Sequence, residues 1–389
     1  MAKARTSPLL GELRAELAAL ESQSQLRHLA ILPETNFCSN DYLALSRDDR
    51  LRRAAKAALE EGSAVGATGS RLLSGNATIW ESLEAELAQF AGAEAALYCN
   101  SGYAANVGLF GCIAGPADLI FSDSANHASI VDGIRLSGAR KVIFPHLDLG
   151  RLEEELRKYQ ADPGRKIIAV ESVFSMDGDR APLADLAALA VRWGAALIVD
   201  DAHATGVFGE KGRGLASDTG PVLLATVHTC GKALAGVGAY VCGSETLKQF
   251  LINRARTFIF STALPPYVAA QMRAVLPIVG AAEDRRAHLI NLGTHLRARL
   301  RESGFDVARS DSQIVPVVLG ANERAVQFAE RLCDAGFAVR AIRPPTVPAG
   351  TARLRLSLHA GMSVALLDAL VSALVRIRDE MPAPAYSSL

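Results

Sequence analysis

Between residues 95 and 243 the sequence alternates short apolar runs with amphipathic helical patterns. Seven runs predict strands: AALYC, DLIFS, KVIFP, KIIAVES, AALIVD, LLATVHT and GAYVCG. Consecutive residues in most of these runs are apolar, so both faces of each strand must be buried. Helical patterns such as LGRLEEELRKY and PLADLAALAVRW separate several of the runs. The alternation predicts a doubly wound α/β domain whose mostly parallel, seven-stranded sheet is covered by helices.

The 389 residues are enough for two or three domains. An amphipathic helix is predicted at 9–29, with one leucine face formed by Leu10, Leu13, Leu17 and Leu20. Further helices are predicted at 48–61, 78–91, 282–303, 321–335 and 362–380. The strand candidates QIVPVVLG, FAVRAI and ARLRLSL lie among the last of these helices. We therefore expect an N-terminal helix and segment (1–49), a large α/β domain (50–270) and a smaller C-terminal α+β domain (271–389).

Composition excludes several classes of protein. The 41 basic residues balance 41 acidic ones, so no net charge draws the chain to nucleic acid or to an anionic membrane. No apolar run approaches the roughly 20 residues of a membrane-spanning helix. The start, MAKARTSPLLGEL, lacks the apolar core of a secretory signal, and a cytoplasmic protein is expected. The six cysteines lack CxxC spacing, which favours reduced thiols and argues against a metal site.

Two of the first strands end in residues suited to chemistry. Ligands of open α/β sheets bind at the carboxyl ends of strands. After AALYC, Ser101, Gly102 and Tyr103 open a helix whose N–H groups could bind a phosphate, although Ser101 also fits a plain N-cap. After DLIFS, His127 stands in a polar loop before a helix, where a structural histidine is the alternative.

Two later strands end in charged residues. Asp200 closes AALIVD, and a buried carboxylate there needs a cation or hydrogen-bond donors. A metal ligand, a ribose contact and the partner of a protonated ring nitrogen all fit Asp200. A helix N-cap fits Asp201 better. In HTCGKALAGVGAY, Lys232 has only small neighbours to pack its stem, which suits a ligand-binding amine, although an exposed structural lysine is the alternative.

Nucleotide-binding motifs fail at these loops. The GK pair at 231–232 has Thr226 where a phosphate-binding loop needs glycine, and Ala233 where it needs serine or threonine. No GxGxxG opens a helix after the first strand, although GATGS at 66–70 is glycine-rich. A nucleotide-binding oxidoreductase is therefore a weaker alternative, and a non-catalytic binding protein is a third.

Pyridoxal 5′-phosphate would use all four strand ends together. That cofactor needs a lysine to hold its aldehyde as a Schiff base and a carboxylate to keep its ring nitrogen protonated. It also needs a flat group over its ring and an anion site for its phosphate. The four strand ends supply each of these groups.

The order SGYAAN, NHAS, FSMDGD, VDDAHATG, TCGK and FSTALPP resembles the α-oxoamine synthases, which are fold-type I pyridoxal-phosphate transferases. The resemblance covers nearly the whole chain. It implies a homodimeric acyltransferase that joins an amino acid to an acyl thioester with loss of carbon dioxide. The segments at 69–76 and 342–358 are most similar to the member that uses L-alanine and a pimeloyl thioester in biotin biosynthesis. The alternatives within the family are glycine C-acetyltransferase, 5-aminolevulinate synthase and serine palmitoyltransferase.

The resemblance also implies the roles of cofactor-binding residues. Lys232 would form the Schiff base, Asp200 would pair with the ring nitrogen, and His203 would hydrogen-bond the ring hydroxyl. His127 would stack on the ring beside the substrate. Further cofactor contacts would come from Gly102, Tyr103, Ser175 and Thr229. Thr262 would reach the phosphate bound in the partner subunit, which implies shared active sites.

The substrate contacts implied by the resemblance lie near the two ends of the chain. Asn40 and Arg355 would bind the substrate carboxylate, and Arg27 and Thr346 would contact the acyl substrate. The acyl carrier could be coenzyme A or acyl carrier protein. The lysine segment departs from the family pattern, because Ala235 and Ala239 stand where relatives often have glycine. A methyl group there could narrow the site or limit backbone freedom.

Overall fold

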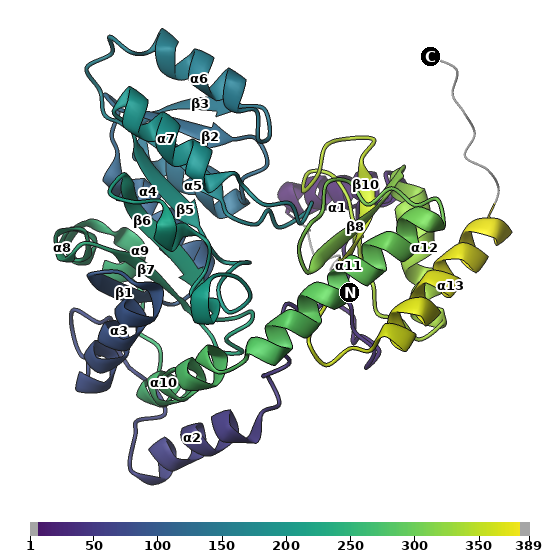
Figure 1. Cartoon of the computed structure of the whole chain (residues 1–389), viewed down its shortest axis with the longest axis horizontal. Helices are drawn as coiled ribbons and strands as arrows, with labels where there is room; N and C mark the ends of the chain where they lie inside the picture. The colour runs from purple at the N-terminus through teal and green to yellow at the C-terminus, as the bar shows by residue number, and fades with distance from the viewer. Residues whose placement is uncertain (1–6, 382–389) are drawn as a thin grey trace.

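The computed structural model describes residues 7–381, which form two lobes (Figure 1). The large lobe contains the predicted seven-stranded sheet, in the order β1-β7-β6-β5-β4-β2-β3. Its strands are β1 (Ala95–Cys99), β2 (Leu119–Asp123), β3 (Arg140–Phe144), β4 (Lys166–Glu171), β5 (Ala196–Asp200), β6 (Leu223–Thr229) and β7 (Ala239–Gly243). Only β7 runs antiparallel to its neighbours, β1 and β6. The mostly parallel sheet predicted from the apolar runs is confirmed.

Helices cover both faces of this sheet, as the two-sided burial of its strands requires. One face packs on α4 (Gly102–Ile113), α5 (Ala128–Ser137), α8 (Glu245–Arg254) and α9 (Arg256–Ile259). The other face packs on α6 (Leu149–Lys158), α7 (Leu183–Trp193), α3 (Thr78–Ala91) and α10 (Pro266–Gly280), with α2 (Asp49–Glu60) outside α10. Ile120 belongs to the first interface and its neighbours Leu119 and Phe121 to the second, so consecutive apolar residues serve opposite faces.

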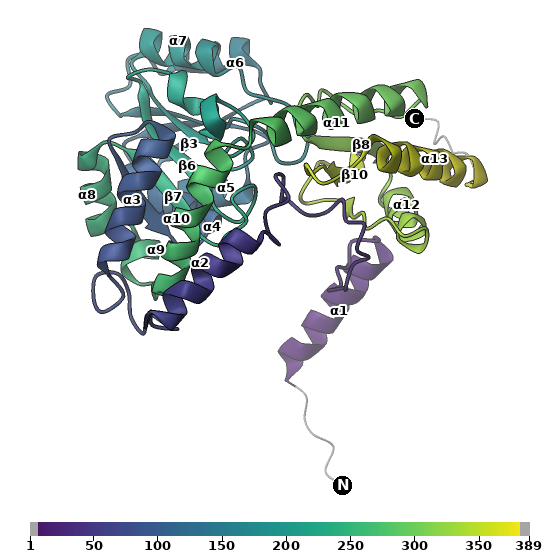
Figure 2. The same cartoon turned by 60° about the horizontal axis from the view of Figure 1, so that its bottom comes forward.

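The small lobe is an antiparallel sheet covered by helices, which confirms the predicted α+β unit. Its strands are β8 (Ile314–Gly320), β9 (Ala341–Ile342) and β10 (Ala352–Ser357), in the order β8-β10-β9. Its helices are α11 (Glu283–Glu302), α12 (Asn322–Asp334) and α13 (Val364–Glu380). The predicted strand FAVRAI is reduced to its last two residues. One apolar core runs from α3 and α10 through α11 to β8, so the lobes pack directly on each other (Figure 2).

The division into 1–49, 50–270 and 271–389 is kept as a proposal. Its second boundary falls within α10, a helix that packs against α2 and α3. Two short 3₁₀ turns, η1 (Glu210–Gly212) and η2 (Ala216–Asp218), lie in the connection between β5 and β6. Among residues 7–381, no helix is both long and apolar enough to cross a bilayer.

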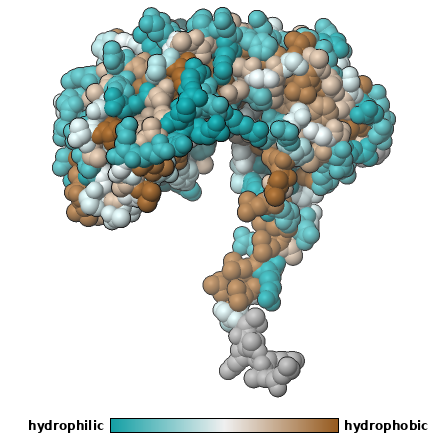
Figure 3. Space-filling view, turned by 90° about the horizontal axis from the view of Figure 1, so that it is seen from below, coloured by the Kyte–Doolittle hydropathy of each residue, from teal (hydrophilic) through white to brown (hydrophobic). Residues whose placement is uncertain are grey.

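The first helix differs from its prediction. It spans α1 (Pro8–Ser22) and stops well before residue 29. Ser24 takes a left-handed backbone conformation, φ +51°, and the amides of Gln25 and Leu26 both turn back to the Leu20 carbonyl, which ends the helix. No residue of α1 is buried, and Leu17 is 52% exposed. The leucine face therefore lies on a projecting arm that is apolar over much of its surface (Figure 3).

Candidate active site

The carboxyl ends of β1, β2, β4, β5 and β6 meet at one edge of the large sheet and line a cavity of about 390 Å³. Asp200 ends β5 beside Glu171, its register partner on β4. Sequence-predicted residues that line the cavity are Asn40, Gly102, Tyr103, His127, Asp200, His203, Thr229 and Lys232. The structure therefore brings together residues from all four predicted strand ends and from the N-terminal segment.

Lys232 lies deep in this cavity. Its loop is closed by backbone hydrogen bonds from Cys230 N to Gly238 O (2.9 Å) and from Gly236 N to Cys230 O (2.8 Å). Within residues 7–381 the amine of Lys232 has no hydrogen bond or ion pair. Burial lowers the pKa of Lys232 to about 8, although the charges of Asp200 and Glu171 oppose the shift. A substantial share of this amine is therefore neutral and nucleophilic near physiological pH.

The lowered pKa of Lys232 predicts its reactivity in the cofactor-free protein. Labelling by a small amine-reactive reagent should rise through about pH 8, because burial favours the neutral amine there. An unperturbed lysine has a pKa of about 10.4. Mass spectrometry of the labelled peptides measures the profile, with the exposed Lys56 as an internal reference. A Lys232 profile that follows the ordinary lysine value would contradict the prediction.

Asp200 is oriented by two donors. Its Oδ2 accepts from Asn106 Nδ2 at 2.6 Å, and its Oδ1 accepts from the Ala202 amide at 2.9 Å. Asn106 also donates to Ser129 Oγ at 3.0 Å, which holds its amide in place. Sequence reasoning missed Asn106. The available signal was a polar side chain at a buried position of α4, directly after a strand end.

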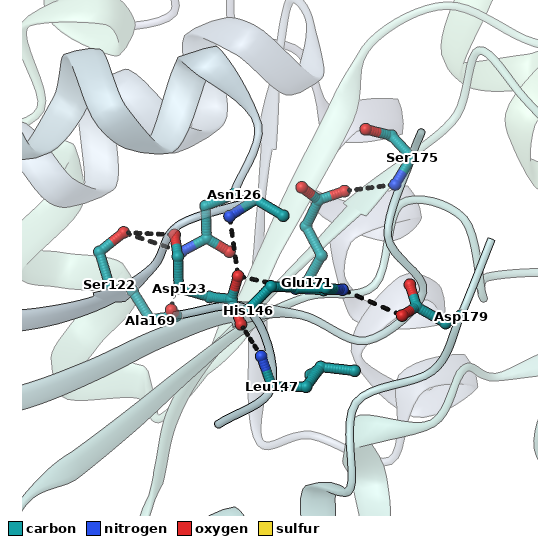
Figure 4. A network of polar contacts seen from close by, with 10 residues as sticks. Ser122, Asp123, Asn126, His146, Leu147, Ala169, Glu171, Ser175 and Asp179 are labelled. Carbon is teal, nitrogen blue, oxygen red and sulfur yellow. Dashed lines mark hydrogen bonds and ion pairs between the residues drawn. The ribbon is translucent and has the colours of Figure 1, made fainter. Parts of the chain in front are cut away.

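Glu171 is a second carboxyl group that the sequence prediction missed. It is buried at the end of β4, and burial together with the charge of Asp200 raises the pKa of Glu171 to about 8. Its Oε2 accepts from the Ser175 amide at 3.2 Å, while Oε1 has no partner among the described residues (Figure 4). The available signal in the sequence was a charged residue, Glu171, that follows the apolar residues of KIIAVES. Asp200 follows the apolar residues of AALIVD in the same way.

The two site histidines have neutral rings. Burial lowers the pKa of His127, and Lys232 adds to that shift although Asp200 opposes it. Its Nδ1 lies 2.7 Å from Ser129 Oγ and accepts from the Ser129 amide at 3.2 Å. Burial, then the charges of Lys232 and Arg355, hold the pKa of His203 well below its usual range. The Nδ1 of His203 contacts the hydroxyl of Tyr42 at 2.6 Å, another residue the prediction missed.

Arg355 and Asn40 meet although they are 315 residues apart. Arg355 comes from β10, and its Nη1 donates to Asn40 Oδ1 at 3.1 Å. Its Nε donates to the Ser175 carbonyl at 2.5 Å, in the loop that follows β4. Predicted residues from two other regions thus contact the guanidinium of Arg355, a group that binds carboxylates in a bidentate manner.

The remaining predicted residues lie around this centre. Arg27 donates to Thr346 Oγ1 at 3.5 Å, so the two predicted acyl contacts are neighbours, although neither lines the cavity. The Thr262 carbonyl accepts from Asn100 Nδ2 at 2.6 Å, which places FSTALPP beside the end of β1. Tyr103 is half-exposed, and its hydroxyl hydrogen-bonds Asp132.

Ala235 and Ala239, the two alanines that depart from the family pattern in the lysine segment, have different structural settings. Ala235 lies in the left-handed region at φ +48°, where a side chain costs about 1–2 kcal/mol relative to glycine. Ala239 is the first residue of β7, fully buried and paired with Cys99 and Thr229. The methyl of Ala235 therefore strains the loop backbone, whereas that of Ala239 fills the core.

The cavity fits a phosphorylated aromatic aldehyde. A Cβ on Gly102 would lie 2.5 Å from Thr229 Cγ2, so the start of α4 can lie this close to the end of β6 only because residue 102 is glycine. The first turn of a helix presents free N–H groups that suit a phosphate. The unpartnered amine of Lys232 suits an aldehyde, and the oriented carboxylate of Asp200 suits a protonated ring nitrogen. Glu171 Oε1 and Asn106 Oδ1 are also buried without partners among the described residues.

Comparisons with known proteins show the family to which this chain is similar. A family model for class I and II aminotransferases matches residues 33–374. The 8-amino-7-oxononanoate synthase of Geobacter sulfurreducens is 48% identical over 348 residues, which cover 88% of each chain. That of Anaeromyxobacter dehalogenans is 48% identical over 350 residues, covering 89% of this chain and 87% of that protein.

Solved structures resemble most of the chain. Serine palmitoyltransferase from S. paucimobilis, with bound pyridoxal phosphate and myriocin, superposes with a TM-score of 0.88 at 30% identity over 96% of this chain and 99% of that one. The 8-amino-7-oxononanoate synthase of Francisella tularensis gives a TM-score of 0.76 at 29% identity, over 88% and 97% of the two chains.

Proposed function

The chain belongs to the class I and II aminotransferase family and, within it, to the 8-amino-7-oxononanoate synthases, and from its site we propose how it performs their reaction. It is a pyridoxal-phosphate-dependent acyltransferase of biotin biosynthesis, as the sequence resemblance predicted. It condenses L-alanine with a pimeloyl thioester to give 8-amino-7-oxononanoate, carbon dioxide and the free carrier. The relatives do not favour glycine C-acetyltransferase or a nucleotide-binding oxidoreductase. The observation that carries the proposal is that the amine of Lys232, which has no hydrogen bond or ion pair among the described residues, shares one cavity with Asp200.

Specific residues would hold the cofactor. Bound pyridoxal phosphate supplies an aldehyde that joins to amines and a protonated ring that stabilises negative charge on the substrate α-carbon. Lys232 would attach it covalently, and Asp200 would face its ring nitrogen. His203 would contact the ring hydroxyl, and neutral His127 would cover one face of the ring. The remaining contacts would come from Gly102, Tyr103, Ser175 and Thr229.

The chain's own groups then bind L-alanine and move its proton. Arg355, with Asn40, would hold the carboxylate by charge-assisted hydrogen bonds. Lys232 Nζ is the base for the α-proton, because a pKa of about 8 leaves it neutral often enough near physiological pH. The proton stays on Lys232 Nζ until it is returned to the product. Asp200 keeps its carboxylate aligned through Asn106 and Ala202 and stabilises a nearby positive charge.

Three further features belong to this proposal. Thr262 would contact the phosphate bound by a second copy of the chain, so the enzyme would act as a homodimer with shared sites. Arg27 and Thr346 would contact the acyl substrate, which could arrive on coenzyme A or on acyl carrier protein. The enzyme would act in the cytoplasm.

A substrate matrix tests the proposed function. Alanine, glycine and serine are each combined with pimeloyl, acetyl and palmitoyl thioesters, and products are identified by mass. We expect L-alanine with the pimeloyl thioester to exceed every other pair by at least about tenfold, or about 1.4 kcal/mol of discrimination. The cofactor-free protein, with no other change, is the control for background reaction. A preference for glycine with the acetyl thioester would overturn the substrate assignment.

A further inference from the structure

His146 lies outside the cavity and has no part in the reaction derived above. It stands in the loop between β3 and α6, and its two ring nitrogens face two buried carboxyl groups (Figure 4). Nδ1 is 2.9 Å from Asp123 Oδ1, and Nε2 is 2.9 Å from Asp179 Oδ2. The ring also packs edge-on against Phe174, with 4.4 Å between ring centroids. A ring that meets an acceptor on each side must donate from both nitrogens.

The charge of His146 compensates the two carboxylates. Burial disfavours the imidazolium, but hydrogen bonds to Asp123 and Asp179 and the charges of both outweigh it and raise the pKa of His146 to about 10. Asp123 has further donors, the amides of Ala125 (2.8 Å) and Leu147 (2.9 Å). In the described part of the chain, the side chain of Asp179 has no donor except His146, and its Oδ1 is buried without a partner.

Asp179 belongs to the turn 172–181, which follows β4. The turn is closed by hydrogen bonds from Phe174 N to the Asp179 carbonyl (3.0 Å) and from Gly178 N to the Phe174 carbonyl (2.9 Å). The Gly178 carbonyl accepts from the Asp311 amide of the small lobe at 3.1 Å. The Asp179 side chain thus connects this turn, through His146, to Asp123 at the end of β2.

The same turn holds substrate-binding groups in place. The Ser175 carbonyl accepts from Arg355 Nε at 2.5 Å, and the Ser175 amide donates to Glu171. Asp177 forms an ion pair with Arg353, which stands two residues from Arg355 on β10. The Nη1 atom of Arg355 has its own acceptors, but its Nε depends on the Ser175 carbonyl, so the direction of the guanidinium follows the turn.

We propose that His146 is a positioning residue for the amino-acid carboxylate: it holds Asp179 against the end of β2, fixes the turn 172–181 and thereby orients Arg355. The inference rests on the proposed function, because it takes Arg355 as the group that binds the carboxylate of L-alanine. His146 acts through the turn and touches neither substrate nor cofactor.

The test is His146→Phe in the cofactor-loaded full-length enzyme. Phenylalanine keeps a flat ring but donates no hydrogen bond, so Asp179 loses its donor. We expect KM for L-alanine to rise at least about tenfold, as misalignment of one charge-assisted contact implies, with KM for the pimeloyl thioester within about twofold. The dissociation constant of L-alanine, measured from the change in cofactor absorbance without acyl substrate, should rise by the same factor.

The chain offers a matched control. His295 contacts Asp368 at 2.9 Å with similar exposure, 30% against 26% for His146, but it bridges α11 and α13. His295→Phe should leave both KM values unchanged. Hydrogen exchange gives a readout independent of turnover: peptides covering 172–181 should exchange faster in His146→Phe and at the wild-type rate in His295→Phe. His146→Gln, which can donate to one carboxylate, should give an intermediate KM for L-alanine and serves if His146→Phe does not fold.

The outcomes separate this inference from the proposed function. Wild-type enzyme that neither binds L-alanine nor turns it over would overturn the proposed function. Wild-type activity with an unchanged KM for L-alanine in folded His146→Phe and His146→Gln would overturn only the role of His146. Equal rises in both KM values, or a rise matched by His295→Phe, would also overturn it, because a general loss of stability would then explain the effect.

Discussion

The substitution Lys232→Ala is expected to abolish turnover, with a loss of about 10⁴-fold or more, because it removes both the covalent anchor and the base. The amine of Lys232 lies in the cavity with no partner among the described residues, and its lowered pKa of about 8 suits proton abstraction. Borohydride reduction of wild-type enzyme should fix the cofactor to the peptide that contains Lys232. The same treatment of Lys232→Ala should leave the protein mass unchanged.

One further variant and a rescue experiment separate the functions of Lys232. Lys232→Arg keeps the positive charge, but arginine stays protonated and supplies no base, so it should be as inactive as Lys232→Ala. Added methylamine should partly restore α-proton exchange of L-alanine in Lys232→Ala, since a small amine can occupy the vacated space. Lys56→Ala, an exposed site on α2 that pairs with Glu60, is the control and should behave as wild type. Normal turnover by Lys232→Ala would refute the assignment.

The large sheet could be predicted because its signal is local. Each apolar run reports burial on both faces, and the predicted strand LLATVHT coincides with β6. The predicted helix at 78–91 coincides with α3 in the same way. The predicted range of the first helix was wrong because the end of this helix has no such local signal. Its leucine spacing predicts an apolar face, but neither what that face contacts nor the left-handed turn at Ser24 can be read from periodicity.

The site was predictable where one residue carries its own signal. Asp200 and Lys232 stand out as charges beside apolar or small residues, and the strand-end rule places them together. Glu171, Asn106 and Tyr42 were missed because their importance arises from contacts with distant residues. Tyr42, for example, meets His203 across 161 positions of sequence. Only the folded chain shows that Glu171 and Asn106 line the cavity and that Tyr42 contacts His203, which also lines it.

The substitution Asp200→Asn is expected to lower kcat by at least about a hundredfold, the size of effect seen when one preorganised polar group is lost from a site. Asparagine keeps the shape of the side chain but removes the anion that would hold the pyridinium proton. The α-proton exchange of L-alanine, followed by NMR without acyl substrate, should fall by a similar factor while cofactor content stays near wild type. Exchange at the wild-type rate would contradict the role of Asp200.

Asp201 provides the matched control for Asp200. It is the next residue and is also buried, with burial raising the pKa of Asp201 to about 6, but its Oδ2 accepts from the backbone amides of Leu215 and Ala216, each at 3.1 Å. Asp201→Asn should therefore lower the free energy of unfolding by about 1–3 kcal/mol, since a buried acceptor is lost. Its proton exchange rate should stay within a few-fold of wild type. If Asp200→Asn slows proton exchange and Asp201→Asn lowers only the free energy of unfolding, Asp200 serves the reaction and Asp201 the fold.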